Sequence, residues 1–218
     1  MTFLTMVKLL AEGFLTTVGI FALTLVFSLP LGLLVAFGRM SRFRPLKLIV
    51  KVYISIMRGT PLMLQLLVVY FGPNLVFGVS TPSNWRFLAV IVAFALNYAA
   101  YFAEIYRSGI EGIPAGQHEA AAILGYSRSQ TFVKIIMPQV IKRILPPVTN
   151  EVITLVKDTS LAYAIGTVEM FTRAKQIVVA PNSPGMLTFL VAAVFYYVFN
   201  SIVAFGMERC ERALSYYK

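Results

Sequence analysis

Two apolar segments of the chain carry polar and ionisable side chains at the spacing of a helix face. In the first, Asn97, Tyr101 and Glu104 recur at spacings of four and three residues, which aligns them on one face. In the second, two adjoining faces collect five polar residues: Asn150, Glu151, Thr154, Lys157 and Asp158. An ionisable side chain at the centre of a membrane helix costs about 2.5–3.5 kcal/mol, so these side chains must face protein or a water-filled path. The polar faces of the two segments could form the walls of a route for a zwitterion.

The same residues also have a structural interpretation, which stays open at this point. Glu104 lies near the end of its segment and would then pair only with Arg107 or with a neighbouring helix. Lys157 and Asp158 would neutralise partners at an interface between subunits. Ionisable residues within a membrane are functional candidates by default, and their position alone does not decide between these roles.

Several kinds of chemistry are excluded or disfavoured by composition. Cys210 is the only cysteine and His118 the only histidine, so an intrachain disulfide and a cysteine-rich metal cluster are impossible. A histidine-based metal site or catalytic triad is disfavoured for the same reason. The chain contains no Gly-Lys pair, and therefore no P-loop for ATP. We expect a chain that is not an enzyme and that holds neither a metal nor a cofactor.

The elements that position these residues are expected to be membrane helices. The chain of 218 residues is 58% hydrophobic and 13% charged, with a mean hydropathy of +0.78, which indicates one integral membrane domain over residues 1–218. The net charge of +10 fits basic residues that flank membrane spans better than nucleic-acid binding. Since a bilayer needs about 20 apolar residues per helix, we expect five spans: Phe14–Phe37, Pro61–Val79, Phe87–Tyr106, Leu145–Val168 and Met186–Met207. The fourth is the weakest, because it carries three of the ionisable residues.

The distribution of lysine and arginine predicts an orientation. Thirteen of them lie on one side of the spans, in three segments: the one between spans one and two, the one between spans three and four, and the one after span five. Four lie on the other side. The excess of positive charge marks the cytoplasmic side, so the N-terminus is expected outside and the C-terminus, including Lys218, in the cytoplasm. Before the second span, Lys47, Lys51, Ser55 and Arg58 form a polar stripe on an otherwise apolar helix, which is expected to lie at the cytoplasmic interface. Thr60 is expected to cap the second span, with Pro61 as its first helical residue.

A polar segment at about residues 114–138 is predicted to form a cytoplasmic elbow of two short helices. Gln117–Leu124 has strong helix formers, with Glu119 in the first turn and Gly125 where a C-terminal glycine would end it. Ser127 and Gln130 have the spacing of a capping box, and the helix that they start is expected to end at Pro138. Three consecutive alanines, residues 120–122, give the first helix a thin profile that another surface could approach closely. An ordinary solvated loop is the simpler alternative.

The elbow resembles the EAA motif of ABC-importer permeases. That motif has Glu-Ala-Ala, three residues, Gly, nine residues, Ile, one residue and Leu-Pro. The chain matches it at each spacing, with Met137 in place of Leu, through six residues: Glu119, Ala120, Ala121, Gly125, Ile135 and Pro138. The resemblance implies that these six residues couple the chain to an ATPase.

Three further stretches resemble the polar amino acid uptake permeases of the histidine/glutamine/arginine type. They are Met57–Leu66, Ala99–Ile110 and Asn150–Leu161. This resemblance implies the type I importer permease fold with a cytoplasmic coupling helix, in a bacterial cytoplasmic (inner) membrane. It also implies a second permease subunit, two ABC ATPase subunits that bind the ATP, and an extracytoplasmic amino-acid-binding protein.

Two other classes of function remain open from the residues. An ion-coupled secondary carrier would use Glu151 and Lys157 as a relay. A membrane anchor would only recruit a soluble partner through the elbow. Copurification of an ATPase together with ATP-dependent uptake distinguishes the importer from both.

Overall fold

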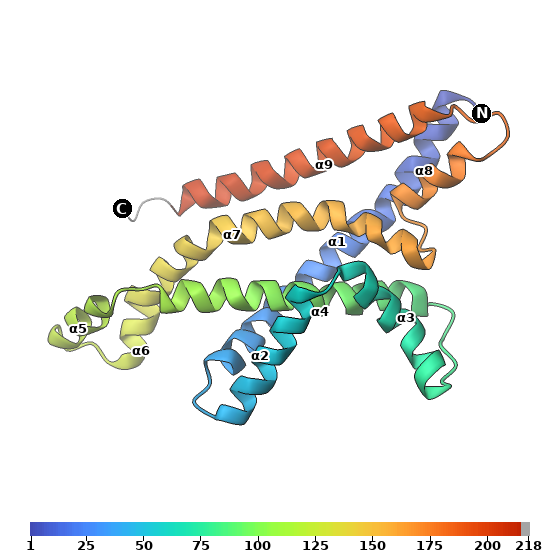
Figure 1. The fold of residues 1–218 in the computed structure, drawn as a ribbon. Helices are drawn as coiled ribbons and strands as arrows, with labels where there is room; N and C mark the ends of the chain where they lie inside the picture. Colours follow the sequence, from blue (N-terminus) through green and yellow to red (C-terminus); the bar gives the residue numbers. More distant parts are fainter. Residues whose placement is uncertain (215–218) are drawn as a thin grey trace.

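The computed structural model describes residues 1–214, and within that range its regular elements are all helices (Figure 1). The predicted all-helical class is therefore confirmed. Lys218, which the orientation argument included, lies outside the described residues. The longest helix, α1 (Phe3–Met40), begins at Thr2, whose side-chain oxygen accepts a hydrogen bond from the backbone N–H of Thr5. It packs along α4 (Trp85–Glu111), which is the most buried of the long helices.

Small residues bring α1 and α4 close together. The buried face of α1 includes six of them, at intervals of four or seven residues: Gly13, Thr17, Thr24, Ser28, Gly32 and Ala36. A Cβ atom added at Gly32 would lie 2.8 Å from the Cβ of Phe102 on α4. Membrane helices associate mainly through such close van der Waals packing, because lipid supplies no hydrophobic drive between them.

A sharp bend separates α2 (Arg44–Gly59) from α3 (Leu62–Phe77). The two helices form an angle of 111°, and α2 carries the predicted polar stripe within one helix. The predicted cap is wrong: Pro61 is the N-cap of α3, and the Thr60 hydroxyl donates backwards to the carbonyl of Ile56 at 2.8 Å. A proline disfavours the helical conformation of the residue before it, and Thr60 is accordingly extended, so the chain turns there.

The predicted elbow contains α5 (Ala115–Ile123), α6 (Arg128–Thr131) and the π-helical turn η1 (Phe132–Ile136), which leads directly into α7 (Met137–Asp158). The prediction that Pro138 ends a helix is therefore wrong. Pro138 is the second residue of α7. In the π-helical turn before it, the N–H of Met137 pairs with the carbonyl of Phe132, five residues back, so the turn holds one residue more than an α-helical turn.

The chain after α7 changes helix type before it reaches the last long helix. The 3₁₀ helix η2 (Thr159–Ile165) is followed by Gly166 with φ of +73°, then by α8 (Met170–Val178) and α9 (Met186–Ala213). The segment predicted as the fourth span, Leu145–Val168, thus consists of the last part of α7 followed by η2, and its position in the membrane stays a prediction. In Figure 1, α8 lies at the end of the molecule opposite to α5 and α6.

The number of spans is smaller than predicted when length and apolar composition are the criteria. Within residues 1–214, α1, α4 and α9 are long and apolar enough to cross a bilayer, and the bent pair α2–α3 adds a fourth if it counts as one span. In contrast, α7 carries five charged residues: Lys142, Arg143, Glu151, Lys157 and Asp158. It nevertheless packs between α4 and α9 (Figure 1).

Candidate functional site

The polar residues of α4 do not all face one open space. Asn97 is only 5% exposed, and its side-chain amide donates to the carbonyl of Met57 at 3.0 Å and to the Oε1 of Gln65 at 2.9 Å. The Gln65 amide in turn donates to the carbonyl of Thr60 and to its hydroxyl. Asn97 therefore fixes the bend between α2 and α3, because it supplies donors to groups that the bend removes from helical pairing.

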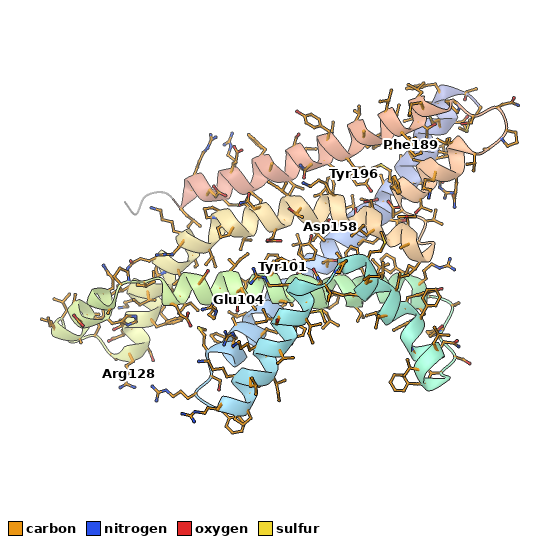
Figure 2. All side chains as sticks on the ribbon, in the orientation of Figure 1. Tyr101, Glu104, Arg128, Asp158, Phe189 and Tyr196 are labelled. Carbon is orange, nitrogen blue, oxygen red and sulfur yellow. The ribbon has the colours of Figure 1, made fainter. Side chains whose placement is uncertain are left out.

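Glu104 is the centre of an ion-pair network that joins three helices. Its carboxylate lies 2.6 Å from Arg107 on its own helix, 3.7 Å from Arg39 on α1 and 3.9 Å from Arg58 on α2. The pairing of Glu104 with Arg107 that the structural interpretation proposed is confirmed. The guanidinium of Arg58 also lies 5.3 Å from the centre of the Tyr101 ring, a cation–π distance. Figure 2 shows Tyr101 and Glu104 along α4.

Tyr98 joins α4 to α7 and was not anticipated. This tyrosine is 2% exposed, and its hydroxyl donates to the Oδ2 of Asp158 at 2.8 Å. Asp158 is the last residue of α7 (Figure 2). Tyr98 stands three residues before Tyr101 and so shares its side of the helix, which is the signal that could have identified it.

The remaining predicted path residues form an open polar face on α7. Asn150, Thr154 and Lys157 are exposed, and Glu151 between them is half-buried. Their spacing places them on adjoining faces of one helix, as expected. The predicted set thus divides into side chains that hold helices together (Asn97, Glu104 and Asp158) and side chains that border open space (Tyr101, Asn150, Glu151, Thr154 and Lys157).

The turn of the elbow has the glycine and the capping box that the sequence predicts. Gly125 has φ of +76°, which only glycine adopts readily, and the N–H of Tyr126 returns to the carbonyl of Ala121 at 3.0 Å. Ser127 and Gln130 form the capping box, with hydrogen bonds of 2.9 Å and 3.3 Å. The prediction that Glu119 lies in the first turn of this helix is wrong. Because α5 begins at Ala115, Glu119 is its fifth residue.

The exposed surface of α5 differs from the predicted thin alanine face. Ala121 is 1% exposed, so it packs within the chain, whereas Glu119, Ala120 and Ala122 are exposed. The largest apolar exposure belongs to two residues that the sequence reasoning missed, Ile123 at 87% and Leu124 at 73%. Their signal was available, because two large apolar residues end a helix that was expected to lie in water.

The two arms of the elbow are tied to each other and to the long helices. The Gln139 amide donates to the Oε1 of Gln117 at 3.2 Å and to the carbonyl of Ile135 at 2.8 Å. Arg143 donates to the carbonyl of Gly112 at 2.7 Å, which joins α7 to the end of α4. Ile135 and Pro138 line a cavity of about 690 Å³ between the arms. A movement of α5 would therefore reach α7 through the Gln117–Gln139 hydrogen bond, and α4 through the contact of Arg143 with Gly112.

Comparison with known proteins decides the family of this chain. The model of the binding-protein-dependent transport system inner membrane component family matches residues 28–216. The chain belongs to this family.

Relatives within this family are similar along nearly the whole chain. The arginine transport system permease protein ArtQ of Bacillus subtilis is 36% identical over 208 residues, covering 95% of this chain and 93% of its own. The L-cystine transport system permease protein TcyB of the same organism is 33% identical over 209 residues, covering 96% and 88%. A crystal structure of an amino acid ABC transporter with histidines has a TM-score of 0.86 at 34% identity, covering 98% of this chain and 99% of that one.

The family match begins inside α1, and the part of α1 before it is held by α8. The hydroxyl of Thr17 accepts a hydrogen bond from the N–H of Met170 at 3.2 Å, and a Cβ atom at Gly13 would lie 2.9 Å from the Cα of Met170. Glu169, which is fully buried, caps α8 by accepting from the N–H groups of Phe171 and Thr172.

Two hydroxyl groups complete the surroundings of Glu169. Those of Thr172 and Tyr196 donate to its carboxylate at 2.8 Å and 3.1 Å, and Tyr196 belongs to α9. Burial raises the pKa of the Glu169 carboxyl, and these hydrogen bonds oppose the rise. Glu169 thus fastens α8 to α9 within this family fold.

Proposed function

We propose that the chain is the transmembrane permease subunit of an ATP-driven importer of polar amino acids. The observation that carries this proposal is the elbow, where the motif residues Glu119 and Gly125 lie on an exposed, capped turn of a chain from this transport family. The relatives are named as transporters of arginine and of L-cystine, which supports an amino acid as the transported substrate. The subunit itself is not catalytic, and a partner ATPase binds and hydrolyses the ATP.

The elbow is proposed to dock on the ATPase through α5. Ile123 and Leu124 would enter an apolar groove on the partner, and the exposed Glu119 and Ala120 would border it. Burying two such side chains is worth about 1.5–3 kcal/mol each when fully removed from water. The hydrogen bond between Gln117 and Gln139 would carry the movement into α7, and that between Arg143 and Gly112 would carry it on to α4.

The substrate path is proposed to follow the open polar face of α7. Its lining would be Glu151, Thr154 and Lys157 with Asn150 beside them, facing Tyr101 and Arg58 across the path. One carboxylate and two cations in this region could hold the two charges of a zwitterion. A second permease subunit, identical or related, would close the other side.

The five-span topology and its orientation are proposed on the same basis. The segment from α7 to η2 would be the fourth span, shielded from lipid by α4, α9 and the second subunit, so that its charges never face acyl chains. The N-terminus and α8 would then lie outside, near an amino-acid-binding protein, and the elbow in the cytoplasm. The membrane would be the bacterial inner membrane.

Reconstitution tests the proposed function directly. The chain is purified with its ATPase partner and placed in vesicles with the cognate binding protein and a labelled amino acid. We expect uptake that requires ATP and does not respond to an ion gradient. Uptake driven by an ion gradient in vesicles without the ATPase would instead assign the chain to the secondary carriers, with Glu151 and Lys157 as the relay.

A further inference from the structure

A strongly basic cavity of about 650 Å³ lies where α1, α2 and α4 meet. Its wall contains five cations and one carboxylate, with one apolar residue: Arg39 from α1; Arg44, Lys47, Leu48 and Lys51 from α2; and Arg107 and Glu111 from α4. These residues come from the last turn of α1, the first half of α2 and the end of α4. The cavity therefore lies at the end of the helix bundle from which the elbow extends (Figure 1).

The positive charge of this cavity is only partly neutralised. Arg107 pairs with Glu104 and Glu111, and Arg39 approaches Glu104 at 3.7 Å. Within residues 1–214, the side chains of Arg44, Lys47 and Lys51 make no ion pair or hydrogen bond. They follow one another at spacings of three and four residues, where like charges repel. A bound anion would relieve that repulsion.

The surroundings of the cavity favour a lipid as the source of the anion. Beside the lysines, α2 exposes two apolar side chains, Leu48 at 62% and Val52 at 50%. Acyl chains can lie along such a surface while a headgroup meets the cations above it. A free inorganic anion would make no use of these apolar side chains. Basic pockets between membrane helices on the cytoplasmic side are suited to anionic lipid headgroups.

We propose that this cavity binds the phosphate headgroup of an anionic phospholipid from the adjacent leaflet. Lys47 and Lys51 contact the phosphate together with Arg44, and Leu48 and Val52 contact the acyl chains. The site is separate from the elbow and from the open polar face of α7. It anchors α2, the first arm of the bent pair, to the lipid surface.

Lipid binding by the purified complex of permease and ATPase tests this proposal. The complex is reconstituted in vesicles of phosphatidylcholine alone or mixed with phosphatidylglycerol, extracted mildly, and analysed by native mass spectrometry for retained lipid. We expect retention of phosphatidylglycerol but not of phosphatidylcholine. Each lysine near an anionic lipid surface contributes about 1 kcal/mol of attraction. The double variant Lys47→Gln/Lys51→Gln should therefore bind phosphatidylglycerol about 30-fold more weakly.

Two further variants separate this site from general charge effects and from misfolding. Arg209→Gln/Arg212→Gln removes two charges from the exposed end of α9 and should retain the lipid as the wild type does. Lys47→Arg/Lys51→Arg keeps the charge and should also retain it. Equal retention in the wild type and in Lys47→Gln/Lys51→Gln would overturn the proposal. Displacement of the lipid by inorganic phosphate, or equal retention of phosphatidylcholine, would overturn it as well.

Discussion

At the scale of single residues, Glu104 is the point where electrostatics holds the helices α1, α2 and α4 together. Three arginines from these helices surround its carboxylate, and its side chain is 18% exposed. Glu111, two turns further along α4, pairs within residues 1–214 only with Arg107 and is 54% exposed. The two carboxylates share one partner but differ in burial and in the number of helices that they connect.

This difference predicts unequal effects of two similar substitutions. Glu104→Gln should lower the free energy of unfolding by about 1.5–3 kcal/mol, the usual worth of hydrogen bonds to charged groups. Glu111→Gln should cost only about 0.3–0.5 kcal/mol, as for exposed pairs one helical turn apart. Thermal unfolding of the two variants in the same detergent measures the contrast. Equal losses would show that Glu104 does not bridge the helices.

Glu151 belongs to the same scale but to the open polar face. The substitution Glu151→Gln keeps the shape of the side chain and removes its charge, so folding and assembly with the ATPase should be unchanged. Transport should change, because the proposed path loses its carboxylate. Uptake kinetics across several polar amino acids measure the effect, and wild-type kinetics for all of them would leave Glu151 a structural residue.

At the scale of elements, the turn of the elbow depends on one backbone conformation. Gly125 has φ of +76°, whereas Gly116 lies in α5 with open space around it. An L-residue in the left-handed conformation costs roughly 1–2 kcal/mol. Gly125→Ala should therefore weaken ATPase copurification and substrate-stimulated ATP hydrolysis, while Gly116→Ala should preserve both, since alanine favours a helix. Gly125→Val should act more strongly still. Identical behaviour of the two alanine variants would mean that the turn does not position α5.

Local signals in the sequence predicted the caps of these elements, and tertiary contacts decided the rest. Gly125 and the Ser127–Gln130 capping box were predictable because each acts within a few residues. The 111° bend after Gly59 is held by Asn97, which is distant in the sequence and donates to Met57 and Gln65. The place of Pro138 was not predicted either, because a proline usually ends a helix, whereas here the chain continues through η1 into α7.

The residues of the candidate site likewise divide into features set by local sequence and features set by tertiary contacts. Helical spacing identified the polar residues of α4 and α7, because spacing is a property of one element. It could not separate Asn97, which is buried under α2, from Thr154, which is exposed. Nor could it show that Ala121 is buried while Ile123 and Leu124 are exposed. Those differences arise only when the helices pack.

At the scale of the whole molecule, the proposed topology places the ends of the long helices on defined sides of the membrane. Cys210, the only cysteine, is exposed near the end of α9, and Ser83 lies in the exposed turn before α4. An impermeant thiol reagent added to intact cells should not label Cys210. It should label the variant Cys210→Ser/Ser83→Cys. Labelling of both positions from the same side would contradict the five-span arrangement.

The central claim is that α5 transmits the work of an ATPase to the membrane helices. The variant Ile123→Asp/Leu124→Asp changes the two most exposed apolar residues of the elbow. Val179→Asp changes the C-cap residue of α8, which is 84% exposed, and α8 lies at the opposite end of the molecule (Figure 1). The measurement is ATPase copurification, followed by ATP-driven uptake in reconstituted vesicles. We predict that the elbow variant inserts normally but loses both, and that Val179→Asp keeps the ATPase. Wild-type copurification and uptake in the elbow variant would contradict the account.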